Sequence, residues 1–235
     1  MTRNLKALGL ALVAVFALSA VVASAATAAP KLTPEPEEYP VTVKASQSGT
    51  NVFELEGGRK TECANFTLEG TIKNKEEAEK SELNLFPTSS ECTTTILGNK
   101  DPSTITWNGC WFRFTISEAA AGAIAAEGWQ WTGTLLHLEC PVGAVQELHV
   151  YSSAANHLAN TPLCTYHSVA QTPGGDVDYR VGLFKWTVVN QAATRTAGTL
   201  TNCGGASQTG TMSGEVKFEL FNSKGEALKT KFDKE

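Results

Sequence analysis

All four histidines of this 235-residue chain lie between residues 137 and 167, and two of them have a glutamate two residues away. If two strands pair around a five-residue loop at 141–145, His137 lies opposite His149 and Glu139 lies opposite Glu147. Two imidazoles and two carboxylates on one patch are ligands typical of zinc or a similar ion. A four-residue loop breaks this register, and the same side chains then belong to an ordinary polar face of a sheet.

Trp111 and Arg113 are a second pair of candidate binding residues, because the surrounding sequence predicts that both face outward. Asn108-Gly109 is the strongest two-residue hairpin signal, and it predicts a hairpin over residues 103–116. The core face of that hairpin is hydrophobic and consists of Ile105, Trp107, Cys110, Phe112, Phe114 and Ile116. An exposed indole on a flat sheet can support a sugar ring, with the guanidinium stacked on it, whereas a covered indole is an ordinary packing residue.

Sequence motifs of the common catalytic sites are absent from the chain. No G-x-S-x-G elbow, H-E-x-x-H zinc motif, phosphate-binding loop or dinucleotide fingerprint occurs. Asp176 and Asp178 follow a Gly-Gly turn, but they offer too few oxygen ligands for calcium. The sequence therefore predicts no catalytic residue and no cofactor. Because two glycosidase carboxylates can come from distant strands, a secreted glycan hydrolase is the alternative to a non-catalytic domain.

The six cysteines fit disulfides better than metal ligands. An even number of cysteines in an exported chain is typical of a disulfide framework, and no C-x-x-C spacing occurs. Six cysteines allow 15 pairings, of which we favour the one between sequence neighbours. The favoured pairs are Cys63–Cys92, Cys110–Cys140 and Cys164–Cys203.

The elements that must position these residues are mainly strands. Hydrophobic and polar residues alternate along 65–72 and 215–220, and turn residues are frequent. The charged run at 73–81 favours a solvated turn over a helix. The sequence predicts an all-β fold, an antiparallel β-sandwich or barrel of about ten to twelve strands. We expect a single domain over 41–235, with a boundary near 152–162 as the alternative.

The first 40 residues are typical of an export leader followed by a spacer. Arg3 and Lys6 precede a long apolar run that ends in small residues, which predicts a cleaved signal peptide over 1–25. A retained membrane anchor is the alternative, because the apolar run approaches the length that spans a bilayer. Residues 26–40 are rich in proline and predict an extended spacer. The protein is therefore expected to be secreted or held at the cell surface, with no membrane span after cleavage.

The charge balance excludes some classes of partner. The formal net charge is −5, and removal of Arg3 and Lys6 with the leader makes the chain more acidic. Nucleic acids and anionic membranes bind through clustered basic residues, and this sequence has no such cluster.

Several short segments together resemble a known group of proteins. They include "EYPVTV" at 38, "FTLEGTI" at 66, "WNGCWFRF" at 107, "LCTYHSVAQ" at 163 and "GTMSGEVKFEL" at 210. In this order the segments are similar to uncharacterised secreted proteins of Gram-positive soil actinobacteria. The resemblance implies an exported β-rich domain with paired cysteines, and it implies no catalytic or binding residue. We therefore expect a non-catalytic domain that binds a ligand, such as a cell-wall or environmental glycan, or that builds the cell surface.

Overall fold

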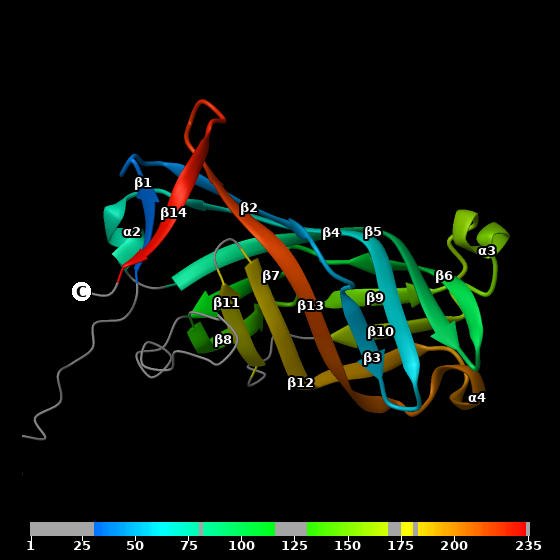
Figure 1. Cartoon of the computed structure of the whole chain (residues 1–235). Coiled ribbons are helices and arrows are strands. Elements are labelled where there is room, and N and C mark those ends of the chain that lie inside the picture. The colour runs from blue at the N-terminus through cyan, green and yellow to red at the C-terminus, as the bar shows by residue number, and fades with distance from the viewer. Residues whose placement is uncertain (1–30, 80–81, 116–130, 169–174, 181–182, 234–235) are drawn as a thin grey trace, which may run out of the picture.

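The computed structural model describes residues 31–79, 82–115, 131–168, 175–180 and 183–233. Nearly all of the regular structure is antiparallel strand, with short helices between some of the strands (Figure 1). The predicted all-β, antiparallel fold class is therefore confirmed.

The described residues form 14 strands of one hydrogen-bonded sheet, more than the ten to twelve expected. The strands are β1 (Lys31–Glu35), β2 (Val41–Gln47), β3 (Val52–Leu55), β4 (Arg59–Ile72), β5 (Glu82–Ile96), β6 (Asn99–Thr106), β7 (Trp111–Thr115), β8 (Trp131–Glu139), β9 (Gln146–Val150), β10 (Cys164–Ser168), β11 (Gly175–Arg180), β12 (Leu183–Ala197), β13 (Ser207–Phe221) and β14 (Ala227–Asp233). The helices are α2 (Lys75–Glu79), α3 (Ala154–Leu158) and α4 (Leu200–Cys203).

The sheet curls until β12 pairs with β13, which closes a ring of strands. The order β13-β2-β4-β5-β6-β9-β10-β12 leads through paired neighbours back to β13. The ring is not a regular barrel, because β3 also pairs with β13 and β4, and β7, β8 and β11 connect β5 to β12 by a second path. Helix α2 lies with β1 and β14 at one end of the body, and α3 and α4 lie at the other (Figure 1).

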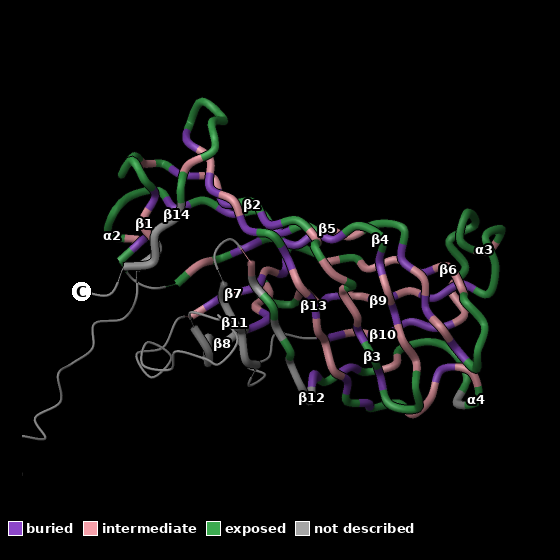
Figure 2. The backbone as a smooth tube through the Cα atoms, in the orientation of Figure 1, coloured by how far each residue is buried: buried purple, intermediate pink, exposed green. Residues whose placement is uncertain are grey.

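Alternating side chains of the strands build two hydrophobic clusters. Buried and exposed residues follow one another along the strands (Figure 2). The larger cluster includes Val43, Leu68, Phe112 and Phe218. The smaller cluster includes Tyr166. The alternation predicted along 65–72 and 215–220 is confirmed, because its hydrophobic members are buried.

The turn at Asn108-Gly109 forms, but it does not create the predicted hairpin. Both residues have positive φ, 50° and 78°, and the amide of Cys110 donates to the carbonyl of Trp107 at 2.8 Å. Strand β6 pairs with β5 and β9, whereas β7 pairs with β5 and β8. The turn therefore connects two strands, β6 and β7, that both pair with β5 and not with each other. The prediction of a hairpin over 103–116 is wrong.

The predicted core face of this segment is nevertheless correct over the residues described. Cys110, Phe112 and Phe114 are buried in the larger cluster, and Trp107 packs against it while partly buried. Ile105 packs against the smaller cluster in the same way. The alternation of hydrophobic and polar residues therefore predicted which side chains face the core, although it did not predict the strand partners. The face of a side chain depends only on whether its position along the strand is odd or even.

All three predicted disulfides are present. They are Cys63–Cys92, Cys110–Cys140 and Cys164–Cys203. The first joins directly opposite residues of β4 and β5. Three disulfides indicate an oxidising environment outside the cytoplasm.

Two predictions about the N-terminal half are wrong in part. Residues 31–35, inside the expected spacer, form β1 and pair with β14. Residues 75–79, inside the expected solvated turn, form α2. Asn74 Oδ1 accepts from the amide of Glu77 at 2.9 Å, and Glu77 Oε2 accepts from the amide of Lys73 at 2.8 Å. This reciprocal capping stabilises the first turn of a short helix.

The expected signal peptide over 1–25 lies outside the described residues. Among those that are described, no helix has the length and apolar character needed to cross a membrane.

Candidate functional site

The predicted histidine and glutamate patch does not assemble. Strand β8 carries His137 and Glu139 and pairs with β7 and β11, whereas β9 carries Glu147 and His149 and pairs with β6 and β10. The register that placed His137 opposite His149 and Glu139 opposite Glu147 is therefore wrong. Residues 140–145 connect β8 to β9 but do not close a hairpin between them. Instead β8 pairs with β7, and β9 pairs with β6.

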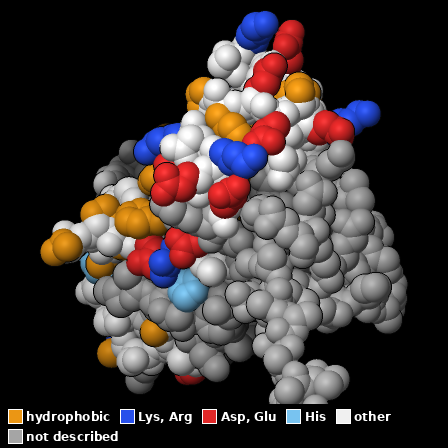
Figure 3. Space-filling view, turned by 90° about the vertical axis from the view of Figure 1, so that its left-hand side faces the viewer, with side chains coloured by type: hydrophobic (Ala, Val, Ile, Leu, Met, Phe, Trp, Pro, Cys, Tyr) orange, Lys and Arg blue, Asp and Glu red, His pale blue; other side chains and the backbone are white. Residues whose placement is uncertain are grey.

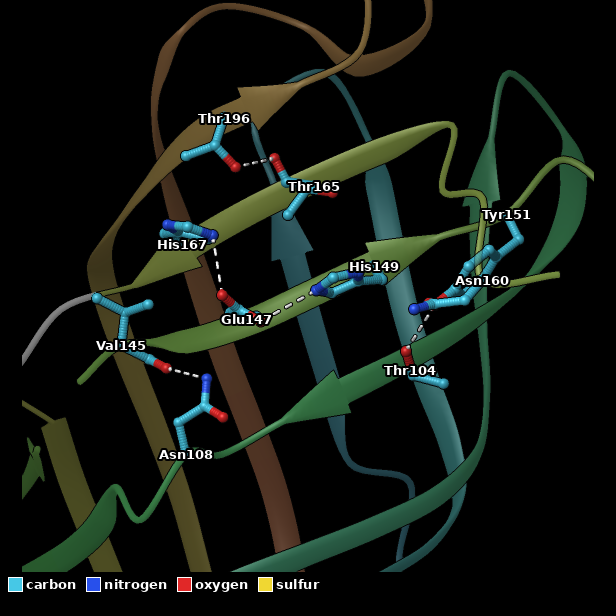
Figure 4. A network of polar contacts seen from close by, with 10 residues as sticks. All are labelled: Thr104, Asn108, Val145, Glu147, His149, Tyr151, Asn160, Thr165, His167 and Thr196. Carbon is cyan, nitrogen blue, oxygen red and sulfur yellow. Dashed lines mark hydrogen bonds and ion pairs between the residues drawn. The ribbon is translucent and has the colours of Figure 1, made fainter. Parts of the chain in front are cut away.

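The structure instead brings Glu147 between two histidines of neighbouring strands. Glu147 Oε2 lies 3.2 Å from His149 Nε2, and Glu147 Oε1 lies 3.2 Å from His167 Nε2 (Figure 4). Tyr151 continues the row: its hydroxyl donates to Asn160 Oδ1 at 2.9 Å. One carboxylate thus lies 3.2 Å from two imidazoles on the outer face of β9 and β10.

This histidine row forms a polar face of the sheet and gives no metal centre. Within the described part of the chain, no three or more histidine, cysteine, aspartate or glutamate side chains are arranged to hold a metal ion. His137 is only 8% exposed and faces Arg113 of β7 across the ladder, far from this row in the strand order.

Trp111 lies on a different outer face, in a row that crosses four strands. Glu69 of β4 is opposite Phe86 of β5, and Trp111 of β7 is opposite Glu139 of β8. The rings of Phe86 and Trp111 close the row, with centroids 6.1 Å apart and planes inclined by 42°. Since neighbouring strands are about 4.8 Å apart, the row is about 14 Å long. We call these four residues the aromatic row.

Phe86 is the exposed member of this pair, with 51% of its surface accessible, whereas Trp111 is half-buried. A single exposed apolar side chain is normal on a protein surface, so the informative feature is that Phe86 and Trp111 place two aromatic rings side by side. Trp111 lies on the outer face, as expected, since its neighbour Phe112 is the buried one.

An open groove of about 850 Å³ runs beside the aromatic row. Its walls are the end of β4 with α2 on one side and the start of β5 on the other; they carry Glu69, Thr71, Glu77, Glu82, Asn84 and Phe86. The groove begins where β4 and β5 separate: β4 continues beside β2, whereas β5 turns to β7.

Arg113 lies at the edge of this groove and is held by two carboxylates. One terminal nitrogen lies 2.8 Å from Glu139 Oε1, and the other lies 3.9 Å from Glu82 Oε1. These ion pairs fix the guanidinium and orient both carboxylates.

The remaining cations near the groove are also engaged. Lys73 lies 3.9 Å from Glu77, and Lys75 lies 3.1 Å from Glu37. The hydrogen bond from Lys75 to Glu37 raises the pKa of that lysine. Acidic and basic side chains accordingly lie side by side on this end of the molecule, with hydrophobic side chains exposed near them (Figure 3).

Phe86 and the glutamates of the groove were not among the residues singled out from the sequence. The signal was present in "ELNLF", because Leu83 and Leu85 alternate as core residues and so place Asn84 and Phe86 on the outer face. Their proximity to Trp111 could not be found, because it depends on the long-range pairing of β5 with β7.

Comparison of the chain with protein-family models, curated proteins and solved structures gives no match.

Proposed function

We propose that this protein is an exported, non-catalytic domain that binds a cell-wall or environmental glycan through its aromatic row. The leader-like sequence at 1–25 and the three disulfides support export. The resemblance to secreted actinobacterial proteins supports the same compartment.

The observation that carries the proposal is the exposed Phe86 ring beside Trp111 at a groove. Sugar rings have apolar faces, and two adjacent aromatic rings held on neighbouring strands offer a surface for them. Because the rings are packed on strands, little conformational entropy is lost when a ligand covers them.

The polar residues of the groove complement the hydroxyl groups of a sugar. Asn84 supplies an amide with both donors and acceptors, and Glu69 and Glu82 supply acceptors. The protein thus combines an apolar platform with convergent polar groups, which is the usual composition of a small-ligand site.

The test is retention of the purified protein on insoluble glycans, namely peptidoglycan, cellulose and chitin. Phe86→Ala and Trp111→Ala should each weaken binding to the retained glycan at least tenfold, which corresponds to about 1.4 kcal/mol. The matched control is Leu158→Ala, because Leu158 is 90% exposed on α3 at the opposite end of the body. Equal loss in all three variants, or no retention of the wild type, would contradict the proposal.

The same experiment distinguishes the predicted alternative, a glycan hydrolase. A hydrolase releases new reducing ends from the bound glycan, and a binding domain does not. If sugar release occurs and Glu69→Gln or Glu82→Gln abolishes it while the glycan is still retained, the protein is an enzyme and the non-catalytic proposal fails.

A further inference from the structure

The groove beside the aromatic row carries more negative than positive charge. Its walls include Glu69, Glu77 and Glu82, and Lys73 is the cation among the described residues that line it. The backbone amide of Lys73 donates to Glu77, and its ammonium lies 3.9 Å from the same carboxylate, so these two charges offset each other. Glu69 and Glu82 therefore decide the charge that a ligand meets.

Glu69 makes no ion pair within the described structure. Lys44 of β2 is opposite it in the ladder, but the Lys44 ammonium lies over the ring of Phe221, 5.7 Å from the centroid. Glu69 is exposed, and it is the direct neighbour of Phe86. A ligand that rests on the Phe86 ring thus meets a free carboxylate at the end of the row.

Among the described residues, the cation paired with Glu82 is Arg113, which Glu82 shares with Glu139. Arg113 makes its short contact, 2.8 Å, with Glu139, and its contact with Glu82 is 3.9 Å long. One guanidinium cannot neutralise two carboxylates, so this group of three keeps one negative charge. The Glu82 side chain is 44% exposed and can reach a ligand.

The two aromatic rings add to the same preference. The faces of phenylalanine and tryptophan rings are electron-rich, and they attract ammonium groups. Glu69 at one end of the row, the remaining negative charge of the Glu82, Glu139 and Arg113 group near the other, and the π-faces between them are thus complementary to a ligand with several positive charges. They oppose phosphate, uronate or other anionic polymers.

We infer that the groove binds a glycan whose sugar rings carry free amino groups, of which a glucosamine polymer is the simplest. This inference rests on the proposed glycan-binding function and adds the chemical class of the ligand. The sugar rings cover Phe86 and Trp111, and the ammonium groups approach Glu69 and Glu82.

The test compares a glucosamine hexamer with its fully N-acetylated form, which has the same backbone and no charge. Affinities are measured by calorimetry at pH 5.5, where carboxylates of ordinary pKa are ionised. The amino hexamer should bind about tenfold more tightly, and the difference should shrink in high salt because exposed charges are screened. Glu69→Gln and Glu82→Gln should reduce the preference, whereas Glu54→Gln on the distant strand β3 should leave it unchanged.

Each other outcome has a distinct meaning. Equal affinity for the two hexamers, with Trp111→Ala weakening both, overturns the inference and leaves the glycan-binding proposal standing. Binding of neither hexamer, together with no retention on any insoluble glycan, removes the proposed function itself. A lysine hexapeptide that binds as tightly as the amino hexamer, with the same response to Trp111→Ala, shows that charge alone is recognised and overturns the sugar class.

Discussion

Gly70 of β4 lies so close to Asn84 of β5 that a Cβ at Gly70 would overlap the Asn84 carbonyl oxygen. The two strands separate beyond this point, so the close approach marks the start of the groove. Gly70→Ala should lower the free energy of unfolding by about 2–3 kcal/mol, because the backbone must shift to relieve the overlap. Urea denaturation measures the change.

Gly205→Ala is the control for Gly70→Ala. A Cβ at Gly205 would have its nearest neighbour at 3.4 Å, and its φ is not in the left-handed region. This variant should be within about 0.5 kcal/mol of the wild type. If Gly70→Ala is equally harmless, the close approach of the two strands is incorrect.

Trp107 and Trp111 should differ in their effect on stability. The Trp107 ring packs edge-on against Phe66 and Phe112, and its Nε1 donates to Ser89 Oγ at 3.2 Å. Trp107→Ala should therefore cost about 3 kcal/mol, and Trp111→Ala only about 1 kcal/mol. Thermal or urea unfolding of both variants provides the comparison. Similar losses would mean that Trp111 is covered and is not a binding surface.

The Cys110–Cys140 disulfide should contribute strongly to stability, because it connects the turn at 107–110 with the irregular residues 140–145. Replacement of both cysteines by alanine should cost about 3–4 kcal/mol for a sequence separation of 30. The control is Asn108→Gly, which removes the hydrogen bond from Asn108 Nδ2 to the Val145 carbonyl, 2.9 Å long and exposed, and tolerates the positive φ of 50° at this position. It should cost about 1 kcal/mol or less. If both variants lost the same free energy of unfolding, the turn and not the disulfide would be the source of the stabilisation.

Glu56 should make stability depend on pH in the acidic range. The side chain and the backbone amide of Thr209 both donate to its carboxylate, and these hydrogen bonds lower the pKa of Glu56. Because the pKa is lower in the folded state, the stabilisation is present above the ordinary glutamate pKa and is lost as the pH falls through the folded value. The stability difference between the wild type and Glu56→Gln should therefore disappear in acid. A difference that stays constant with pH would show that ionisation of Glu56 does not matter.

Alternation and cysteine order were sufficient to predict part of this structure. The buried faces of 65–72, 110–114 and 215–220 follow from parity, which depends on each strand alone. The strand partners do not follow from local sequence. Asn108-Gly109 has the conformation that its composition predicts, yet β6 and β7 pair with β5 and not with each other.

The candidate site was harder to predict for the same reason. His149 and Glu147 do meet, but they are two positions apart on one face of the same strand, and the second histidine is His167 and not His137. Trp111 was found because its face could be assigned. Phe86 was missed because only the pairing of β5 with β7 brings it to Trp111.

The three disulfides join cysteines in the order in which they occur along the chain, with separations of 29, 30 and 39 residues. A chain that emerges N-terminus first into an oxidising space presents each pair completely before the next pair appears. Each cysteine can then meet its native partner before the cysteines of the following pair are available, which reduces the number of wrong pairings that thiol–disulfide exchange would have to reopen. Sequential connectivity of this kind therefore favours correct covalent closure in an oxidising environment.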